Sequence, residues 1–332
     1  MAKMKYVEAL REALRQEMQR DERIYLIGEA LGGGQQGVFK VTQGLQAQFG
    51  PERVVDTPIS EACIAGSAVG SAIFGRRPVA EIMFGNLMAL CADEFHNQAA
   101  KFRYLTDGMI KVPMVLRCVN WTRLVSGPHH CGTMDAMIFN TPGLIAVAPS
   151  TPADAFGLMK SALRQDNPVV YIEHSNLYSI TGEVPADNED FTIPLSKANI
   201  VREGNDVTVV TYSLPYYDCL KAADNLAGEG VSVELIDLRT VVPYDKETII
   251  ESVKKTGRLV VVYEGYKTYG AGSEISAMVA EEAIDYLEAP IIRVAQPDIP
   301  IAANDVMVKQ VSINEKKVAD AVRKVTGVFK NT

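Results

Sequence analysis

Short apolar runs alternate along the chain with longer segments in which apolar residues recur every three or four positions. The first pattern predicts buried β-strands and the second predicts helices. Because the strands carry few polar residues and are separated by helices, we expect an α/β fold with a parallel sheet covered on both faces. In the first half of the chain, strands are expected at residues 24–27, 78–84, 112–119, 144–149 and 168–173, and helices at 86–104 and 152–165.

The alternation pauses between residues 179 and 206, where the sequence is polar and contains several prolines and glycines. This composition predicts a linker that holds one strand. The alternation then resumes, with strands expected at 207–212, 231–238, 258–263 and 291–295, and helices at 215–228, 245–256, 273–288 and 315–326. We therefore expect two α/β domains, at residues 1–185 and 206–332, joined by a linker at 186–205.

Composition and charge narrow the class of protein. The 332 residues include 33 Lys and Arg against 41 Asp and Glu, so the net charge of -8 argues against a nucleic-acid partner. No apolar run reaches the roughly 18 residues of a membrane span, and the charged N-terminus argues against a signal peptide. The five cysteines show no CxxC spacing, which predicts small buried side chains, with no zinc site or disulfide framework, in a cytoplasmic protein.

Two glycine-containing segments invite a ligand-binding interpretation. The segment 32–37 (GGGQQG) matches neither the phosphate-binding loop nor the GxGxxG spacing, so we expect a surface loop there. The glycines at 66, 70 and 75 lie in a predicted helix rich in small residues, which favours close backbone packing over ligand contact.

The segment Asp56–Glu61 (DTPISE) leads from a predicted strand into this helix, which Thr57 or Ser60 can cap. Glu61 in the first turn is either a favourable charge at a helix N-terminus or a functional group. The following residues, ACIAGSAVGSAIFG, are apolar, so we expect the carboxyl to be buried. Burial raises the pKa of a carboxyl, and a carboxyl that holds a proton near neutral pH can serve catalysis.

A second candidate is the loop Ser126–Thr133 (SGPHHCGT), where His130 can act as a functional group. Adjacent histidines such as His129 and His130 seldom bind one metal, and no metal-binding spacing is present. Cys131 suggests a thiol nucleophile, but no third group accompanies it. The remaining histidines, His96 and His174, are interpreted as structural.

Several segments together resemble the beta subunit of the thiamine-diphosphate-dependent first component of 2-oxo acid dehydrogenase complexes, a family that includes pyruvate, branched-chain and acetoin dehydrogenases. The resemblance covers nearly the whole chain. It implies a transketolase-like pyrimidine-binding domain followed by a transketolase C-terminal-like domain. It rests on DTPISEACIAGSAVGSAIFGRRPVAEIMFGN (56–86), NQAAKFRY (97–104), VAPSTPADAFGLMKSAL (147–163), DNPVVYIEH (166–174), ELIDLRTVVPYD (234–245) and KKTGRLVVVYEGYKTYGAGSEI (254–275).

The resemblance also implies roles for single residues. Glu61 corresponds to the family's catalytic glutamate, which hydrogen-bonds a ring nitrogen of the cofactor's aminopyrimidine. His130 corresponds to a loop histidine that assists proton transfers and the hand-over to the lipoyl group. Glu29 matches an acidic residue near the cofactor, and Leu87 stands where the family usually stacks an aromatic ring on the pyrimidine. A potassium site, built largely from backbone carbonyls, is implied at Met114, Ala162, Leu163, Gln165 and Asn167.

A missing motif implies a partner. The family holds the cofactor's magnesium ion with a GDG motif on a separate alpha subunit, and no GDG occurs in this chain. We therefore expect a heterotetramer of two alpha and two beta chains, with a lipoyl acyltransferase core as a further partner and a small 2-oxo acid or acetoin as substrate.

The chain also departs from the family. The usual Gln-His-Ser-Gln is here His129-His130-Cys131-Gly132, and the preceding CVNWTRLVSGP (118–128) lacks the family's glycine-rich run. These departures motivate an alternative, a non-oxidative thiamine-dependent carboligase or transketolase-like half-enzyme. A non-catalytic chain that stabilises its partner is the third hypothesis, against which the presence of both Glu61 and His130 argues.

Overall fold

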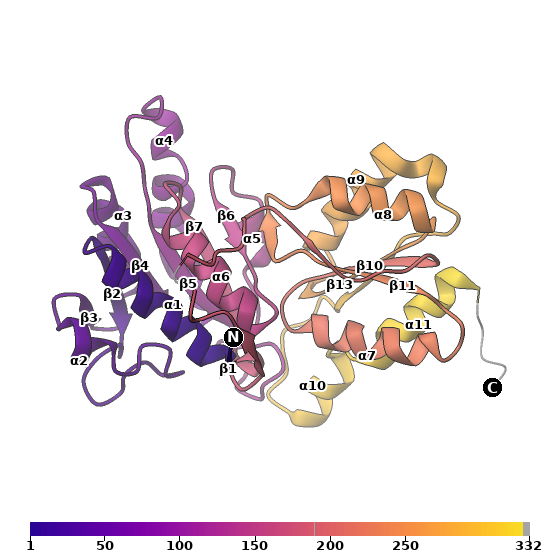
Figure 1. The fold of residues 1–332 in the computed structure, drawn as a ribbon, viewed down its shortest axis with the longest axis horizontal. Coiled ribbons are helices and arrows are strands. Elements are labelled where there is room, and N and C mark those ends of the chain that lie inside the picture. Colours follow the sequence, from indigo (N-terminus) through magenta and orange to yellow (C-terminus); the bar gives the residue numbers. More distant parts are fainter. Residues whose placement is uncertain (189, 328–332) are drawn as a thin grey trace. The chain divides into compact units, whose positions relative to one another are not determined.

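The computed structural model describes residues 1–188 and 190–327. The chain divides into two compact units. The first consists of residues 1–121 and 129–195, and the second of residues 122–128 together with those from Ser196 onward (Figure 1). Each unit is built around its own sheet.

The strands of the first unit form a parallel sheet in the order β6-β7-β5-β4-β2-β3. All five strands expected in this half are present, within a few residues of the predicted ends. With β3, the six strands of the first unit in this sheet are β2 Ile24–Glu29, β3 Val54–Thr57, β4 Arg77–Ile82, β5 Val115–Asn120, β6 Ile145–Val147 and β7 Val169–His174. A separate antiparallel pair joins β1 (Ala2–Lys5) to β8 (Thr181–Val184).

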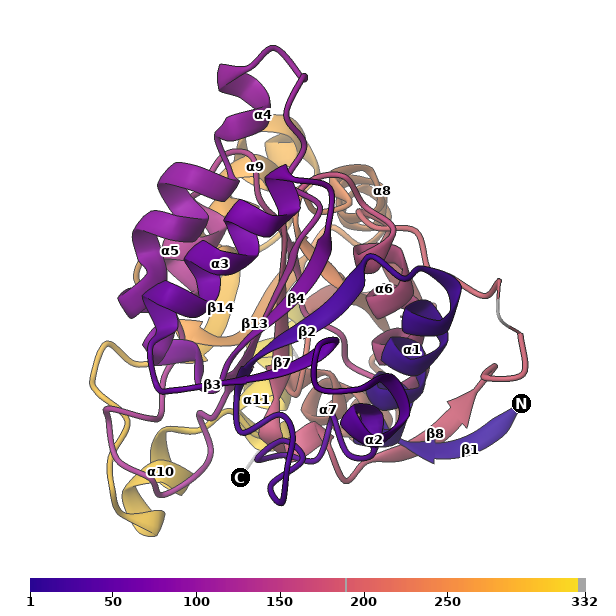
Figure 2. The same cartoon turned by 90° about the vertical axis from the view of Figure 1, so that its left-hand side faces the viewer.

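Helices cover both faces of this sheet, as predicted. Helices α1 (Tyr6–Arg20) and α6 (Pro152–Leu163) pack together on one face, and α3 (Glu61–Ile73) lies on the other (Figure 2). Shorter helical segments complete the unit: α2 Leu45–Phe49, α5 Asp135–Phe139 and η3 Ser175–Leu177.

Helix α3 differs in packing from the prediction. A Cβ added at Gly66 would lie 3.6 Å from the Glu94 side chain, but one added at Gly70 would meet no atom within 4 Å. Gly75 follows the helix and has a φ of +92°, a conformation that glycine adopts without strain. The close packing predicted for these glycines is therefore wrong at Gly70, whose backbone is uncovered.

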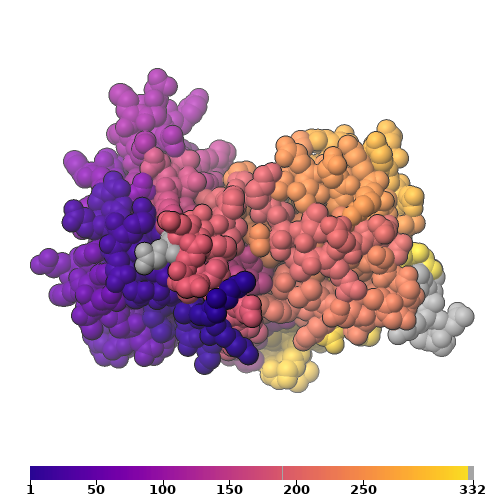
Figure 3. Space-filling view, in the orientation of Figure 1, coloured from indigo at the N-terminus to yellow at the C-terminus, as the bar shows by residue number. Residues whose placement is uncertain are grey.

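The single helix predicted at 86–104 is instead three segments: a 3₁₀ helix η1 (Gly85–Cys91), a π-helical segment η2 (Asp93–Ala99) and the short α4 (Phe102–Leu105). The buried residues Met88, Cys91, Phe95 and Ala99 follow at intervals of three and then four. A three-residue interval keeps side chains on one face of a 3₁₀ turn, so the apolar pattern continues while the hydrogen bonding changes. The segment around α4, coloured purple, protrudes from the surface in the space-filling view (Figure 3).

The second unit is built around a five-stranded sheet in the order β14-β13-β10-β11-β9, in which only β9 runs antiparallel. Helices α7 and α11 cover one face, and α8 and α9 cover the other (Figure 1). The strands of this sheet are β9 Asn199–Arg202, β10 Val207–Thr211, β11 Val233–Asp237, β13 Leu259–Tyr266 and β14 Ile292–Gln296. The short strand β12 (Thr240–Val242) is not part of it. The helices are α7 Pro215–Ala227, α8 Lys246–Thr256, α9 Ala271–Ala283, η4 Ile284–Tyr286, α10 Asp305–Val311 and α11 Glu315–Thr326. Strand β9 falls within the expected linker and belongs to this sheet.

Helix α11 shows how the sequence sets these elements. Asn314 caps it by accepting a hydrogen bond from the Lys317 backbone N–H at 3.0 Å. Val318, Val322 and Val325 lie on one face and are buried in the core of the second unit. Apolar residues at this spacing direct one helical face toward the sheet.

Among the described residues, no helix is long and apolar enough to cross a bilayer. All five cysteines are unpaired, and four of them are buried, as the sequence predicted; Cys63 is exposed.

Candidate active site

Glu61 is placed by the connection between β3 and α3. Strand β3 ends at Thr57, the register partner of Glu29 on β2, and α3 begins at Glu61. Ser60 occupies the N-cap position but is exposed and makes no side-chain hydrogen bond to the helix. The Thr57 hydroxyl is buried and has no partner among the described residues. The predicted cap is therefore wrong, although the predicted start of the helix is correct.

The Glu61 side chain is buried, with 7% of its surface exposed. It makes neither a hydrogen bond nor an ion pair with any residue in 1–188 or 190–327. Its carboxyl oxygens are not among the buried polar atoms that lack a partner, so they still reach solvent within the described chain. Such a group is suited to a ligand that supplies the missing hydrogen bond.

Glu29 lies half-buried at the end of β2. Burial raises the pKa of its carboxyl, and the charges of Glu61 and Glu81 raise it further. Carboxylates repel one another in this way only when they are near each other. Glu29, at the end of β2, therefore lies within electrostatic reach of Glu61, the first residue of α3.

Leu87 is half-buried on η1, which packs against α3. Burial, with smaller contributions from the charges of Glu94 and Glu61, raises the pKa of the Cys91 thiol on the same element to about 12. Segment η1 therefore lies beside Glu61.

The start of η1 also holds the loop of His130. The His130 ring is exposed and meets the Phe84 ring edge to face, with centroids 5.0 Å apart. The Asn86 side-chain amide donates a hydrogen bond to the Cys131 carbonyl at 3.1 Å. Gly132 has a φ of +148°, and a Cβ there would lie 2.6 Å from the Asn86 side chain, so the close approach requires glycine. Segment η1 thus packs on the helix that begins at Glu61 and, at its start, holds the loop of His130.

A set of aromatic rings, which the sequence patterns did not reveal, surrounds this connection. Phe84 stacks on Trp121 with centroids 5.0 Å apart and planes inclined by 6°. Phe39 meets both rings edge-on, at 6.2 and 5.8 Å, and lies 5.3 Å from the Tyr178 ring. Trp121 directly follows β5, and Phe84 follows β4 by two residues. The sequence could have indicated these two residues as site candidates, because both follow the carboxyl ends of neighbouring parallel strands.

Beneath the aromatic rings lies a buried ionic network. Arg117 on β5 pairs with Glu81 on β4 and donates two hydrogen bonds to Glu173 on β7, at 2.6 and 2.9 Å. The Tyr178 hydroxyl donates to Glu173 at 2.7 Å. Burial raises the pKa of Glu81 and the charge of Glu173 adds to this, while Arg117 opposes both.

Comparisons with known proteins match both units. Residues 2–181 match the family model described as transketolase, pyrimidine binding domain, and residues 196–318 match transketolase, C-terminal domain. The chain is 42% identical to 2-oxoisovalerate dehydrogenase subunit beta of Bacillus subtilis, over 97% of this chain and 98% of that protein. It is 44% identical to pyruvate dehydrogenase E1 component subunit beta of Rickettsia conorii, over 96% and 97%. The chain belongs to this family of dehydrogenase beta subunits.

A further relative of the beta subunit is named for a different substrate. The chain is 41% identical, over 95% of both proteins, to the beta subunit of acetoin:2,6-dichlorophenolindophenol oxidoreductase of Cupriavidus necator. Among solved structures, a protein described as "Split gene transketolase, inactive beta4 tetramer" matches with a TM-score of 0.79 and 23% identity, over 97% of this chain and 98% of that one. That likeness shows the fold. The resemblance inferred from the sequence is confirmed.

The other candidate groups of this beta subunit are accounted for by contacts within the chain. His96 hydrogen-bonds the Thr141 hydroxyl at 2.8 Å, and His174 is buried and accepts a hydrogen bond from a backbone N–H. His129 is exposed. Cys131 has 1% of its surface exposed, which argues against a nucleophilic thiol.

The glycine-rich segment is fixed in place by side chains. The Gly32 N–H donates to Asp56 at 2.9 Å, and the Gly33 N–H donates to Gln46 at 2.8 Å. These two N–H groups bind the chain itself, in keeping with the predicted surface loop.

The expected potassium ligands are Met114, Ala162, Leu163, Gln165 and Asn167. The carbonyls of Leu163 and Gln165 face a common point, but that point is a guanidinium nitrogen of Arg77, which donates to them at 3.0 and 2.7 Å. The Asn167 side chain accepts from Arg103 at 2.6 Å. Arg77 thus binds two of the five expected carbonyls, and the potassium site stays a prediction.

The fit is better for thiamine diphosphate, whose pyrimidine ring the first domain of this family binds. The unpartnered Glu61 carboxyl matches a ring nitrogen that needs a hydrogen-bonding partner. Within the part of the chain that the structure describes, no group of three His, Cys, Asp or Glu could hold a metal ion.

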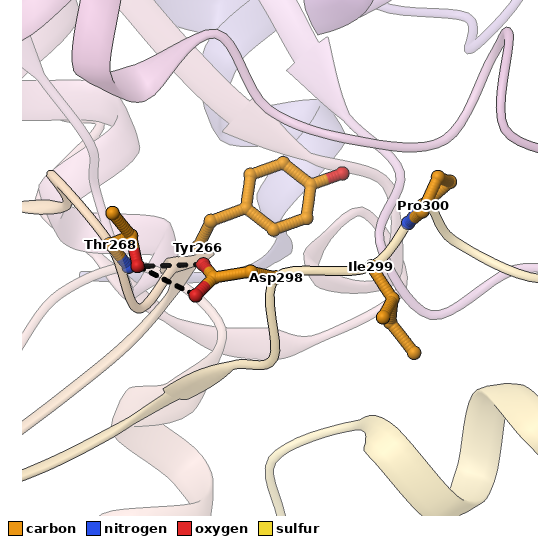
Figure 4. A pocket seen from close by; sticks show the side chains of 5 residues that line it. All are labelled: Tyr266, Thr268, Asp298, Ile299 and Pro300. Atoms are coloured by element: carbon orange, nitrogen blue, oxygen red, sulfur yellow. Dashed lines mark hydrogen bonds between the residues drawn. The ribbon is translucent and has the colours of Figure 1, made fainter.

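A pocket of about 470 Å³ lies in the second unit. Tyr266, Ile299 and Pro300 line it together with Thr268 and Asp298 (Figure 4). The Thr268 backbone N–H and hydroxyl donate to the Asp298 carboxylate at 3.1 and 2.6 Å. No catalytic residue was predicted in this unit.

Proposed function

We propose that this chain forms the pyrimidine side of the active site of a dehydrogenase for a small 2-oxo acid or acetoin. The enzyme cleaves the bond next to the carbonyl and passes the acyl fragment to a lipoyl group. The observation that carries the proposal is the buried, unpartnered carboxyl of Glu61, linked through η1 to the loop of His130.

Glu61 holds or shares a proton at the pyrimidine ring. Only 7% of its surface is exposed, and no ion pair within the described residues occupies its carboxyl. When bound, thiamine diphosphate supplies a nucleophilic carbon and an electron sink. Leu87, on the element beside Glu61, offers an apolar surface to the ring.

His130 moves protons at the reacting end of the site. It is exposed, so a substrate can reach it, and its loop is held to η1 by Asn86 and Gly132. An imidazole changes charge near neutral pH, which suits both donation and acceptance of a proton.

An alpha subunit completes the site in this proposal and holds the diphosphate through Mg²⁺. Three features of the first unit support such a partner. Ile59 and Phe74 flank the two ends of α3 and are 80% and 90% exposed. Between them Cys63 is exposed and the backbone at Gly70 is uncovered. We propose two alpha and two beta chains, with a lipoyl acyltransferase as the acceptor.

The decisive experiment compares wild type with Glu61→Gln in the enzyme assembled with its alpha subunit. Gln fills the same space but cannot take up or release the proton, so kcat is expected to fall on the order of 10²- to 10⁴-fold. Circular dichroism and the yield of assembled enzyme check that folding is unchanged. Unaltered turnover by Glu61→Gln contradicts the proposal.

Substrate and reaction class are resolved in the same preparation. The enzyme is given pyruvate, a branched-chain 2-oxo acid or acetoin, with lipoamide or a two-electron dye as acceptor. Reduction of the acceptor supports a dehydrogenase and identifies the substrate. Carbon–carbon ligation without reduction of any acceptor contradicts the dehydrogenase assignment and indicates a carboligase.

A further inference from the structure

The Phe84 ring, which contacts His130, is itself held by two other rings of the first unit. Trp121 stacks on it, with planes 6° apart, and Phe39 abuts both rings at 86° and 90°. Stacked and edge-on arrangements at 5 to 6 Å are the favourable geometries for aromatic pairs. The Trp121 and Phe39 rings therefore fix the plane of Phe84.

Phe84 in turn limits the orientation of His130. The two rings meet at 84° with centroids 5.0 Å apart. No side-chain hydrogen bond to the imidazole is found among the described residues, so Phe84 is the ring contact that orients this exposed side chain. A small displacement of a catalytic group costs rate because the reacting atoms must be aligned.

We propose that Trp121 is a positioning residue for His130, acting through the Phe84 ring. The inference rests on the role proposed for His130. Trp121 occupies a stretch in which this chain departs from the glycine-rich run of the family that it resembles.

The indole nitrogen helps to separate the role of the ring from that of its polar group. The Trp121 N–H is buried and has no hydrogen-bond partner among the described residues. A buried donor without an acceptor destabilises the folded state, so the N–H itself contributes nothing favourable. What Trp121 provides is a flat ring against Phe84, and a phenyl ring at this position keeps that surface.

The test uses two substitutions in the enzyme assembled with its alpha subunit. Trp121→Phe keeps a ring and removes the unpartnered N–H, so kcat is expected within about twofold of wild type. Trp121→Leu keeps an apolar side chain but loses the stack, and kcat is expected to fall about 10- to 100-fold. Because Glu61 and η1 are unchanged, KM and the Kd of thiamine diphosphate stay near their wild-type values.

Two controls make the outcome unambiguous. Phe191→Leu breaks a stacked pair with Phe156, centroids 6.3 Å apart, elsewhere in the same unit, and is expected to lower Tm without lowering kcat. His130→Gln tests the proposed function itself. If His130→Gln leaves turnover intact, the role of His130 fails. If His130→Gln abolishes turnover while Trp121→Leu matches wild type, or if Trp121→Phe loses as much as Trp121→Leu, the positioning role of Trp121 is overturned.

Discussion

Two acidic residues of the first unit, Glu29 and Glu61, repel each other electrostatically, and neither has an ion-pair partner among the described residues. The sequence predicted the burial of Glu61 from its apolar neighbours, and the structure agrees. The neighbourhood of Glu29 could not be predicted in the same way, because it depends on which strands become adjacent in the sheet.

Glu29→Gln tests the cost of this crowding. The pKa of Glu29 is raised in the folded chain, so its carboxyl favours folding below the ordinary Glu value of about 4.3 and opposes it as pH rises through the raised value. Glu29→Gln should therefore gain Tm relative to wild type between pH 4 and pH 7, by about 1–2 °C. Thermal scans across this range measure the difference.

The same substitution at the exposed Glu52 is the matched control, since it removes a charge without any burial. A Tm advantage of Glu29→Gln that shrinks with rising pH contradicts a raised pKa at this carboxyl.

At the scale of helices and strands, a periodic apolar pattern was sufficient to predict the strands but not the type of every helix. All the strands predicted from apolar runs are present, since a buried parallel strand needs little beyond such a run. The region 85–105 kept its apolar periodicity but changed its helical type twice. In the fold η1 contacts α3 and the His130 loop, which lie far from it in sequence and could not be read from a local pattern.

Strand β5 offers a direct test of the buried ionic network. Arg117→Met leaves the carboxylates of Glu81 and Glu173 buried without their cation, which is expected to cost about 3–5 kcal/mol of folding free energy. Urea unfolding of the isolated chain, followed by circular dichroism, measures the loss.

Lys309→Met on α10 is the control, because it removes an ion pair between exposed side chains. Such pairs contribute little. Equal effects of the two substitutions would show that the network of β5 has no special weight.

For the molecule as a whole, the family and two-domain organisation were accessible from sequence motifs, whereas the surface left for a partner was not. Helix α3 was predicted to use its small residues for packing within the chain, yet Gly70 is uncovered. The sequence could not distinguish packing within the chain from packing against a partner, because small side chains permit close approach in both cases.

Labelling of the Cys63 thiol tests whether α3 contacts the alpha subunit. In the native isolated chain only Cys63 is exposed, so N-ethylmaleimide is expected to modify one thiol per chain, and all five after unfolding in urea. After assembly with the alpha subunit, modification of Cys63 is expected to slow at least tenfold. Mass spectrometry of the labelled peptides gives both results, and unchanged labelling in the complex removes α3 from the proposed interface.

The aromatic rings around Phe84 have one further consequence. Trp121 is the only tryptophan in the 332 residues, and it lies in contact with the ring that touches His130. Excitation at the red edge of indole absorption therefore reports from a single place in the isolated chain. Its emission wavelength and lifetime give a direct optical record of whether the histidine loop is closed against η1 before any partner or substrate arrives.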